Sequence, residues 1–162
     1  MGKYWVFASK NKENIKTASE RLLWGFWKKP HDSKSSRKKS TLAKNWRQFL
    51  HLYNNLSAGD VVFFQLAKSG DIHAVGIAKD RFYDDQTPVW PEEVNKGKVL
   101  FPWRVSFYII IYSEEPLGAY FTHLENYVDG YGIGEAPPHE AETVLEKLRE
   151  KLKSMGIYVK IA

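Results

Sequence analysis

The chain has 162 residues, a net charge of +5 and no cysteine, and 43% of its residues are hydrophobic. This length and apolar content suffice for one globular domain with a sizeable core. The lack of cysteine excludes disulfides, thiolate zinc sites and cysteine nucleophiles, and no apolar run is long enough for a membrane span. We therefore expect one cytoplasmic domain over residues 1–162, with no metal and no cofactor.

The N-terminal third predicts a strand, a helix, a basic loop and a second helix. Residues 3–8 are aromatic and apolar enough for a first strand, and residues 11–23 carry apolar side chains at helical spacing. Residues 28–40 form the loop, and residues 42–56 place apolar side chains on one face of the second helix. A strand that leads into a helix therefore opens the fold.

The basic loop, residues 28–40, has two interpretations. It is either a solvated insertion or an arm that binds a phosphate backbone and releases counterions. The positive net charge favours an acidic partner, of which nucleic acid is the commonest. The candidate backbone contacts are the basic residues of this region and one of a later turn: Lys28, Lys29, Lys34, Arg37, Lys38, Lys39 and Lys68.

The remainder of the chain predicts a mostly antiparallel sheet. Residues 61–66 and 72–78 read as a buried hairpin around the turn at residues 68–71. A loop over residues 81–98, a long strand over 99–112 and an irregular stretch over 113–138 follow. Residues 140–154 predict a closing helix, and residues 157–161 a last strand. We expect an α+β fold, a sheet curled into a barrel and flanked by about three helices.

Six tryptophans are more than a core of this size commonly needs. An indole offers a large flat face and one N–H donor, which suits the wall of a slot for a planar ring. We assign Trp5, Trp46 and Trp103 to the core from their positions on predicted strands and a helix face. Trp24, at the end of the first helix, and Trp90, between two prolines, are candidates for such walls.

Three segments carry a family resemblance. The first is Ser9-Lys10-Asn11-Lys12-Glu13-Asn14-Ile15 with Trp24 nine residues after its end. The second is the hairpin over residues 61–78, and the third is Val89-Trp90 followed by Lys96-Gly97-Lys98 and a strand with Trp103. In this order they resemble the YTH domains and the related EVE domains of the PUA-like superfamily, over residues 4 to about 148. The segment Phe101-Pro102-Trp103-Arg104-Val105 is more similar to the corresponding segment of EVE proteins.

The resemblance implies a small barrel whose aromatic cage takes an unstacked modified base, N6-methyladenine in YTH domains. It implies that Trp24 and Trp90 face each other as walls, that Asn14 recognises the adenine edge, and that the Gly25 carbonyl accepts the remaining N6 hydrogen. The rim and third wall would come from residues near these positions: Ser9, Lys10 and Asn11 for the rim, and Val94 or Asn95 for the wall. The basic residue that YTH domains use on a phosphate has no counterpart around residues 131–135.

For Asn14 and the two tryptophans, structural roles are the alternative. Asn14 lies where a polar side chain caps a helix start, and Trp24 and Trp90 could be core residues. Trp27 or Trp103 could reach the pocket instead.

Three functions follow from the sequence. The resemblance favours a reader of N6-methyladenine in DNA, as the specificity module of an McrBC-type restriction system with an associated AAA+ motor and nuclease. The alternatives are an RNA-binding reader of methylated adenine or another modified base, and an amidohydrolase similar to ASCH domains. The sequence has no nucleophile, triad, Gly-rich phosphate loop or deaminase zinc motif, which argues against the enzyme.

Overall fold

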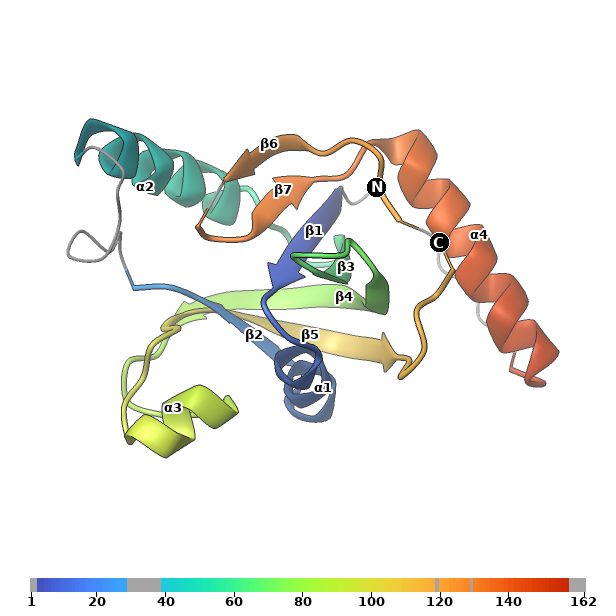
Figure 1. Cartoon of the computed structure of the whole chain (residues 1–162), viewed down its shortest axis with the longest axis horizontal. Helices are drawn as coiled ribbons and strands as arrows, with labels where there is room; N and C mark the ends of the chain where they lie inside the picture. The colour runs from blue at the N-terminus through green and yellow to red at the C-terminus, as the bar shows by residue number, and fades with distance from the viewer. Residues whose placement is uncertain (1–2, 29–38, 119, 129, 158–162) are drawn as a thin grey trace.

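The computed structural model describes residues 3–28, 39–118, 120–128 and 130–157. Within them, seven strands form one sheet and four helices pack around it (Figure 1). In chain order the elements are β1 (Tyr4–Ser9), α1 (Lys12–Arg21), β2 (Leu23–Phe26), α2 (Lys39–Asn54), β3 (Val61–Leu66), β4 (Ile72–Tyr83), α3 (Pro91–Lys96), β5 (Trp103–Tyr112), β6 (Glu125–Val128), β7 (Ile133–Glu135) and α4 (Pro138–Ser154).

The sheet has the strand order β2-β5-β4-β3-β1-β7-β6. Strand β1, next to the central β3, runs parallel to β3, with Tyr4 opposite Val61, and antiparallel to β7, with Trp5 opposite Glu135. The other neighbouring pairs are antiparallel. The expected α+β class with a curled, mostly antiparallel sheet is thus confirmed. The sheet curls without closing, since β2 and β6 remain at its two edges.

Several element boundaries differ from the sequence prediction. The first helix ends at Arg21, because Leu22 adopts a left-handed conformation (φ 54°) in which its N–H donates to the Ala18 carbonyl. The chain then enters β2, so Trp24 lies on a strand and not at a helix end. The predicted loop over residues 81–98 begins with the end of β4 and contains the short α3, and β6 and β7 lie in the stretch expected to be irregular.

Two predicted segments fall mostly outside the described residues. Of the basic loop, residues 29–38 lie outside them, and α2 begins at Lys39. Of the predicted last strand, residues 158–161 lie outside them as well.

The core lies on both faces of the central strands, because successive side chains of a strand point to opposite sides. Trp5 and Phe7 of β1 belong to a cluster that includes residues of α1 and α2, whereas Val6 belongs to a second cluster beneath α4. Trp46 and Trp103 pack against the first cluster as expected. Strands β1 and β3 are therefore buried on both faces, which makes them a rigid base for the segments at their ends.

Asp60 ties the starts of β1 and β3 together. Its carboxylate accepts hydrogen bonds from the Lys3 N–H, the Trp5 Nε1–H and the Ser57 N–H, each at 2.9 Å, and the side chain is buried.

We predict that Asp60→Ala lowers the free energy of unfolding by at least about 1.5–3 kcal/mol, the net value of one hydrogen bond to a charged group. Urea denaturation measures this, and exposed Asp80→Ala, the control, should stay within about 0.5 kcal/mol of the parent. A parental midpoint for Asp60→Ala would contradict this role.

Candidate functional site

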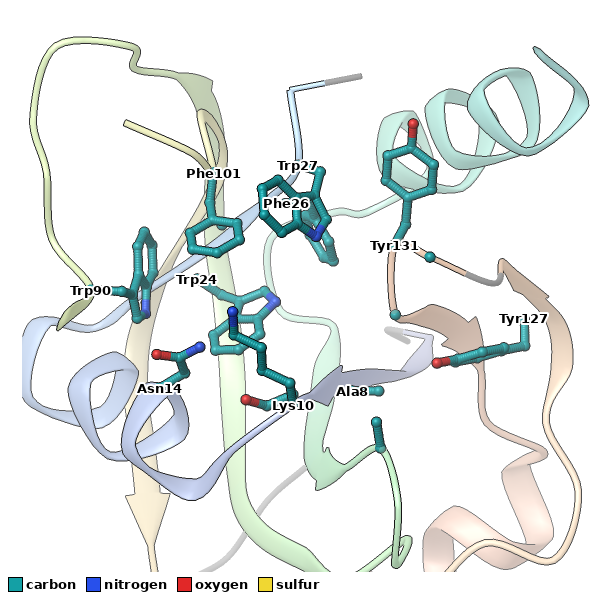
Figure 2. A pocket seen from close by; sticks show the side chains of 15 residues that line it. Ala8, Lys10, Asn14, Trp24, Phe26, Trp27, Trp90, Phe101, Tyr127 and Tyr131 are labelled. Carbon is teal, nitrogen blue, oxygen red and sulfur yellow. The ribbon is translucent and has the colours of Figure 1, made fainter. Parts of the chain in front are cut away.

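A cavity of about 230 Å³ opens between the start of α1, strand β2, the segments flanking α3 and the β6–β7 turn (Figure 2). Pockets for drug-sized ligands usually measure about 300–1,000 Å³, so this one suits a smaller group. Of the residues predicted from the sequence, those that line it are Ser9, Lys10, Asn14, Trp24, Gly25 and Trp90. Segments far apart in the sequence therefore meet here as the resemblance implies.

Trp24 and Trp90 meet at a corner and do not face each other across a slot. Their ring centroids lie 6.0 Å apart and the ring planes are 79° apart, an edge-to-face contact. Such a contact is favourable because the positive edge of one ring meets the negative face of the other. The expectation of two opposed walls is wrong. One indole offers a face to the cavity, and the other closes the cavity at nearly a right angle.

The third aromatic wall is Phe101, which precedes β5. Its ring lies edge-to-face against Trp90, with centroids 5.7 Å apart, and 4.8 Å from the ring of Trp27, which also lines the cavity. Val94 and Asn95, where this wall was expected, lie on exposed positions of α3 and do not line the cavity. The sequence did contain a signal, the aromatic pair Phe101 and Trp103, but both were placed on one long strand.

The side chain of Asn14 is 7% exposed and points into the cavity (Figure 2). Its backbone N–H donates to Asn11 Oδ1 at 2.8 Å, so Asn11 is the residue that caps α1. Asn11 is not among the residues that line the cavity, contrary to the expected rim position. Among the described residues, the Asn14 carboxamide has no hydrogen-bond partner. Buried polar groups are nearly always paired, so this carboxamide is available to a ligand.

The cavity mouth carries a cation. Lys10 lines the cavity and pairs with Glu92 of α3, and Lys96 approaches the same carboxylate at 3.4 Å. The hydrogen bond from Lys10 is the main cause that lowers the pKa of Glu92 below its ordinary value. Ser9, by contrast, is buried and its hydroxyl donates to the Asn11 carbonyl at 2.6 Å. Ser9 thus shapes the turn, while Lys10 reaches the solvent-facing edge.

Gly25 permits the close approach of β2 to the walls. An added Cβ would lie 2.5 Å from the Phe101 carbonyl oxygen and 2.9 Å from Cη2 of Trp90. Real Cβ atoms do not make contacts this short, and a backbone oxygen cannot rotate away. Only glycine therefore fits between the two aromatic walls and the sheet.

A buried ion pair holds these walls. Glu93 is fully buried, and its two carboxylate oxygens accept the N–H groups of Val89 and Trp90 on one side and of Leu100 and Phe101 on the other, four bonds of 2.8–3.4 Å. Arg104 lies 3.4 Å from this carboxylate and donates to the Phe101 carbonyl at 3.1 Å. Its guanidinium carbon also lies 5.3 Å from the centroid of the Trp90 ring. This pair was missed because charged residues in a sequence suggest surface positions.

The predicted backbone-contacting residues are only partly described. Lys28 and Lys68 are exposed, and Lys68 follows Ala67, which lines the cavity. The residues Lys29, Lys34, Arg37 and Lys38, and the side chain of Lys39, lie outside the described part of the chain. Where the chain is described, no three His, Asp or Glu side chains gather to hold a metal ion. No helix in the described ranges combines the length and apolar character that a membrane crossing requires.

We predict that Gly25→Ala distorts the cavity. The added methyl must displace Phe101 or Trp90, at a cost of about 1–3 kcal/mol in the free energy of unfolding. Near-UV circular dichroism and denaturation measure the two effects. Gly70→Ala is the control, because its φ of 76° strains the backbone while the added methyl meets open space. Gly25→Ala with parental stability and an unchanged aromatic spectrum would contradict the close approach.

We further predict that Glu93→Gln destabilises the walls. The amide keeps one acceptor oxygen, so it cannot serve both pairs of N–H groups and it leaves Arg104 less well compensated. Removing one partner of a buried ion pair costs about 3–5 kcal/mol, which thermal or urea denaturation resolves. Glu92→Gln, the same change in the neighbouring, partly exposed pair, should cost about 1 kcal/mol or less. Equal effects of the two substitutions would refute the role of Glu93.

Comparisons with known proteins identify both a relative and the fold. No protein-family profile matches the sequence. Uncharacterized protein MJ1369 of Methanocaldococcus jannaschii is 43% identical over 154 residues, 95% of each chain. The YTH domain of Toxoplasma CPSF4, solved with a 7-mer m6A-modified RNA, superposes with a TM-score of 0.53 at 13% identity over 92% of each chain.

A second solved structure supports the same fold assignment. The YTH domain of the Zygosaccharomyces rouxii MRB1 protein, solved with N6-methyladenosine RNA, gives a TM-score of 0.50 at 15% identity, over 90% of this chain and 83% of that one. The fold is therefore YTH-like. By its identity over nearly the full length of both sequences, the chain belongs to the same protein family as MJ1369 of Methanocaldococcus jannaschii.

Proposed function

We propose that this protein is a reader that binds an unstacked N6-methyladenine of a single-stranded nucleic acid in the cavity. The observation that carries the proposal is the carboxamide of Asn14, nine-tenths buried and without a partner among the described residues, which faces a cavity walled by Trp24, Trp90 and Phe101. Aromatic faces bind a planar ring, and a carboxamide offers a donor and an acceptor to its edge. Together they are suited to a purine base.

In this proposal each wall has its own task. The base stacks on the face of one indole, and the other indole, 79° away, closes the side on which the N6 methyl lies. Asn14 binds the ring edge, and the Gly25 carbonyl accepts the remaining N6 hydrogen. Trp90 Nε1 is a buried donor with no partner in the described structure, which leaves it available to a ring nitrogen.

The energetics explain how methylated and plain adenine are distinguished. Burial of one methyl group contributes about 0.8 kcal/mol. A plain adenine in the same cage buries an N–H without a partner, which costs about 1–3 kcal/mol. The two effects together correspond to roughly 20- to several-hundred-fold in affinity. Stacking on the indole contributes roughly 1–3 kcal/mol to the binding free energy of methylated and plain adenine alike, so it adds affinity without selectivity.

We propose RNA as the partner. The YTH domains of Toxoplasma and Zygosaccharomyces rouxii were solved with methylated RNA, and the fold of this chain is similar to theirs. A single strand is favoured because extraction of a base from a duplex costs a few kcal/mol, roughly. The alternative of DNA, with its restriction system, AAA+ motor and nuclease, rests on the resemblance to EVE proteins at residues 101–105 and on the departures from the YTH pattern. Exposed Lys10, Lys28 and Lys68 are the candidate contacts to the bound backbone in this proposal.

A fluorescence titration with four single-stranded oligonucleotides tests the proposal: RNA and DNA, each with adenine or N6-methyladenine. We expect methylated RNA to bind at least about 20-fold more tightly than plain RNA. Asn14→Ala should weaken the binding of methylated RNA about tenfold, since it removes a buried hydrogen-bonding group. Asn95→Ala is the matched control, because this asparagine is exposed outside the cavity and should leave affinity unchanged.

The outcomes separate the hypotheses. Equal affinity for all four oligonucleotides would refute the reader. Preference for methylated DNA would retain the reader and replace RNA by DNA as its partner. Release of methylamine from N6-methyladenine, or of ammonia from plain adenine, would instead identify an enzyme.

A further inference from the structure

The cavity extends beyond the aromatic corner to a second aromatic ring. Tyr127 of β6 lines the same cavity, and its side chain is 38% exposed. Figure 2 shows Tyr127 at the end away from Trp90, with Ala8 between it and Trp24. An aromatic side chain this exposed, at the rim of a cavity that contains a stacking site, is itself a candidate stacking surface.

The backbone around Tyr127 is irregular, and this irregularity sets the direction of the Tyr127 side chain. The register between β6 and β7 shifts between Glu125 and Val128, and Asn126 has a φ of 52°, a left-handed conformation that a non-glycine residue rarely adopts. Bulges of this kind redirect side chains and occur often beside functional sites. The strained conformation is held by specific bonds, because Asn126 Nδ2 donates to Glu135 Oε2 at 2.6 Å and Gln48 Nε2 donates to the Asn126 carbonyl at 3.3 Å.

The opposite strand makes room for the ring. Gly134 of β7 lies against Tyr127, and a Cβ added there would lie 3.1 Å from Cδ2 of the tyrosine and 3.2 Å from its Cα. A larger residue at this position would push the tyrosine away from the strand. The bulge in β6 and the glycine in β7 thus act together to hold Tyr127 at the cavity rim.

Small residues leave the space between the two aromatic sites open. Ala8, Ala67 and Gly132 line the cavity there. Gly132 has a φ of 71°, and a Cβ at this position would lie 2.7 Å from the Ala8 carbonyl oxygen, so glycine is required. Between Trp24 and Tyr127 the cavity is therefore lined by small side chains, and a ligand larger than one base can extend along this surface.

The charges around Tyr127 indicate which part of a ligand lies there. Glu125 is exposed on the same strand, and Glu135 lies beside Asn126. These carboxylates disfavour a phosphate, whereas the tyrosine ring favours the flat face of a base. We propose that Tyr127 stacks the base of the nucleotide next to the methylated one, so that the protein binds two consecutive nucleotides. This inference rests on the function proposed above.

Ligands of increasing length test the inference. The affinity for the N6-methyladenosine nucleoside is compared with that for dinucleotides that add a uridine on its 5′ or its 3′ side. For one of the two sides, we expect a gain of about 5- to 150-fold, the equivalent of 1–3 kcal/mol for one stacked base. Tyr127→Ala should remove this gain and leave nucleoside binding unchanged, while Tyr127→Phe should retain it. Tyr108→Ala, an exposed tyrosine of β5 outside the cavity, is the control and should behave as the parent.

A ligand with an abasic neighbour, which keeps the sugar and phosphate, tests the same point without a substitution. It should bind no more tightly than the nucleoside. A full gain with the abasic ligand, or a gain that survives in Tyr127→Ala, would overturn the second stacking site. A loss of nucleoside affinity in Tyr127→Ala would also overturn it and make the tyrosine part of the cage for the methylated base. Failure of the parent protein to bind the nucleoside and the dinucleotides would instead refute the proposed function.

Discussion

The ion pair of Glu93 and Arg104 is the interaction on which the aromatic cavity depends. Both side chains are almost completely buried, and every oxygen of the carboxylate serves backbone N–H groups beside Trp90 and Phe101. Two segments without regular structure, before α3 and before β5, are thereby held together at the same point. A buried charge pair contributes little net stability by itself. Its value here is positional, because it fixes two walls that no strand pairing could orient.

Glycines and bulges complement this pair by providing space. Gly25 allows β2 to approach the walls, and Gly132 and Gly134 allow the β6–β7 turn to approach β1 and Tyr127. At each of these positions an added Cβ would lie within about 3.1 Å of a neighbouring atom. The concave shape of the site therefore depends on these glycines as well as on the aromatic side chains. Strands β1 and β3, which are buried on both faces, lie within the sheet that carries these segments.

The corner of Trp24 and Trp90 has a functional consequence that opposed walls would lack. Two parallel rings around a base would contact only its faces and leave its edge to solvent. An edge-to-face pair covers one face and one edge, and the edge is where an N6 methyl group lies. In the proposed function, affinity therefore comes from the stacked indole, and discrimination comes from the perpendicular one together with Asn14.

The sequence by itself determined the elements that depend on local patterns: β1, most of α1, the β3–β4 hairpin, α2, and α4, because hydrophobic periodicity and turn residues are encoded within each segment. It also singled out Trp24, Trp90, Asn14 and Gly25 through a resemblance to YTH domains, and these residues do line one cavity. Only the tertiary structure decided the angle between the indoles, the third wall at Phe101 and the burial of Glu93 with Arg104. These features arise from contacts between segments distant in sequence, and such contacts leave no local periodicity.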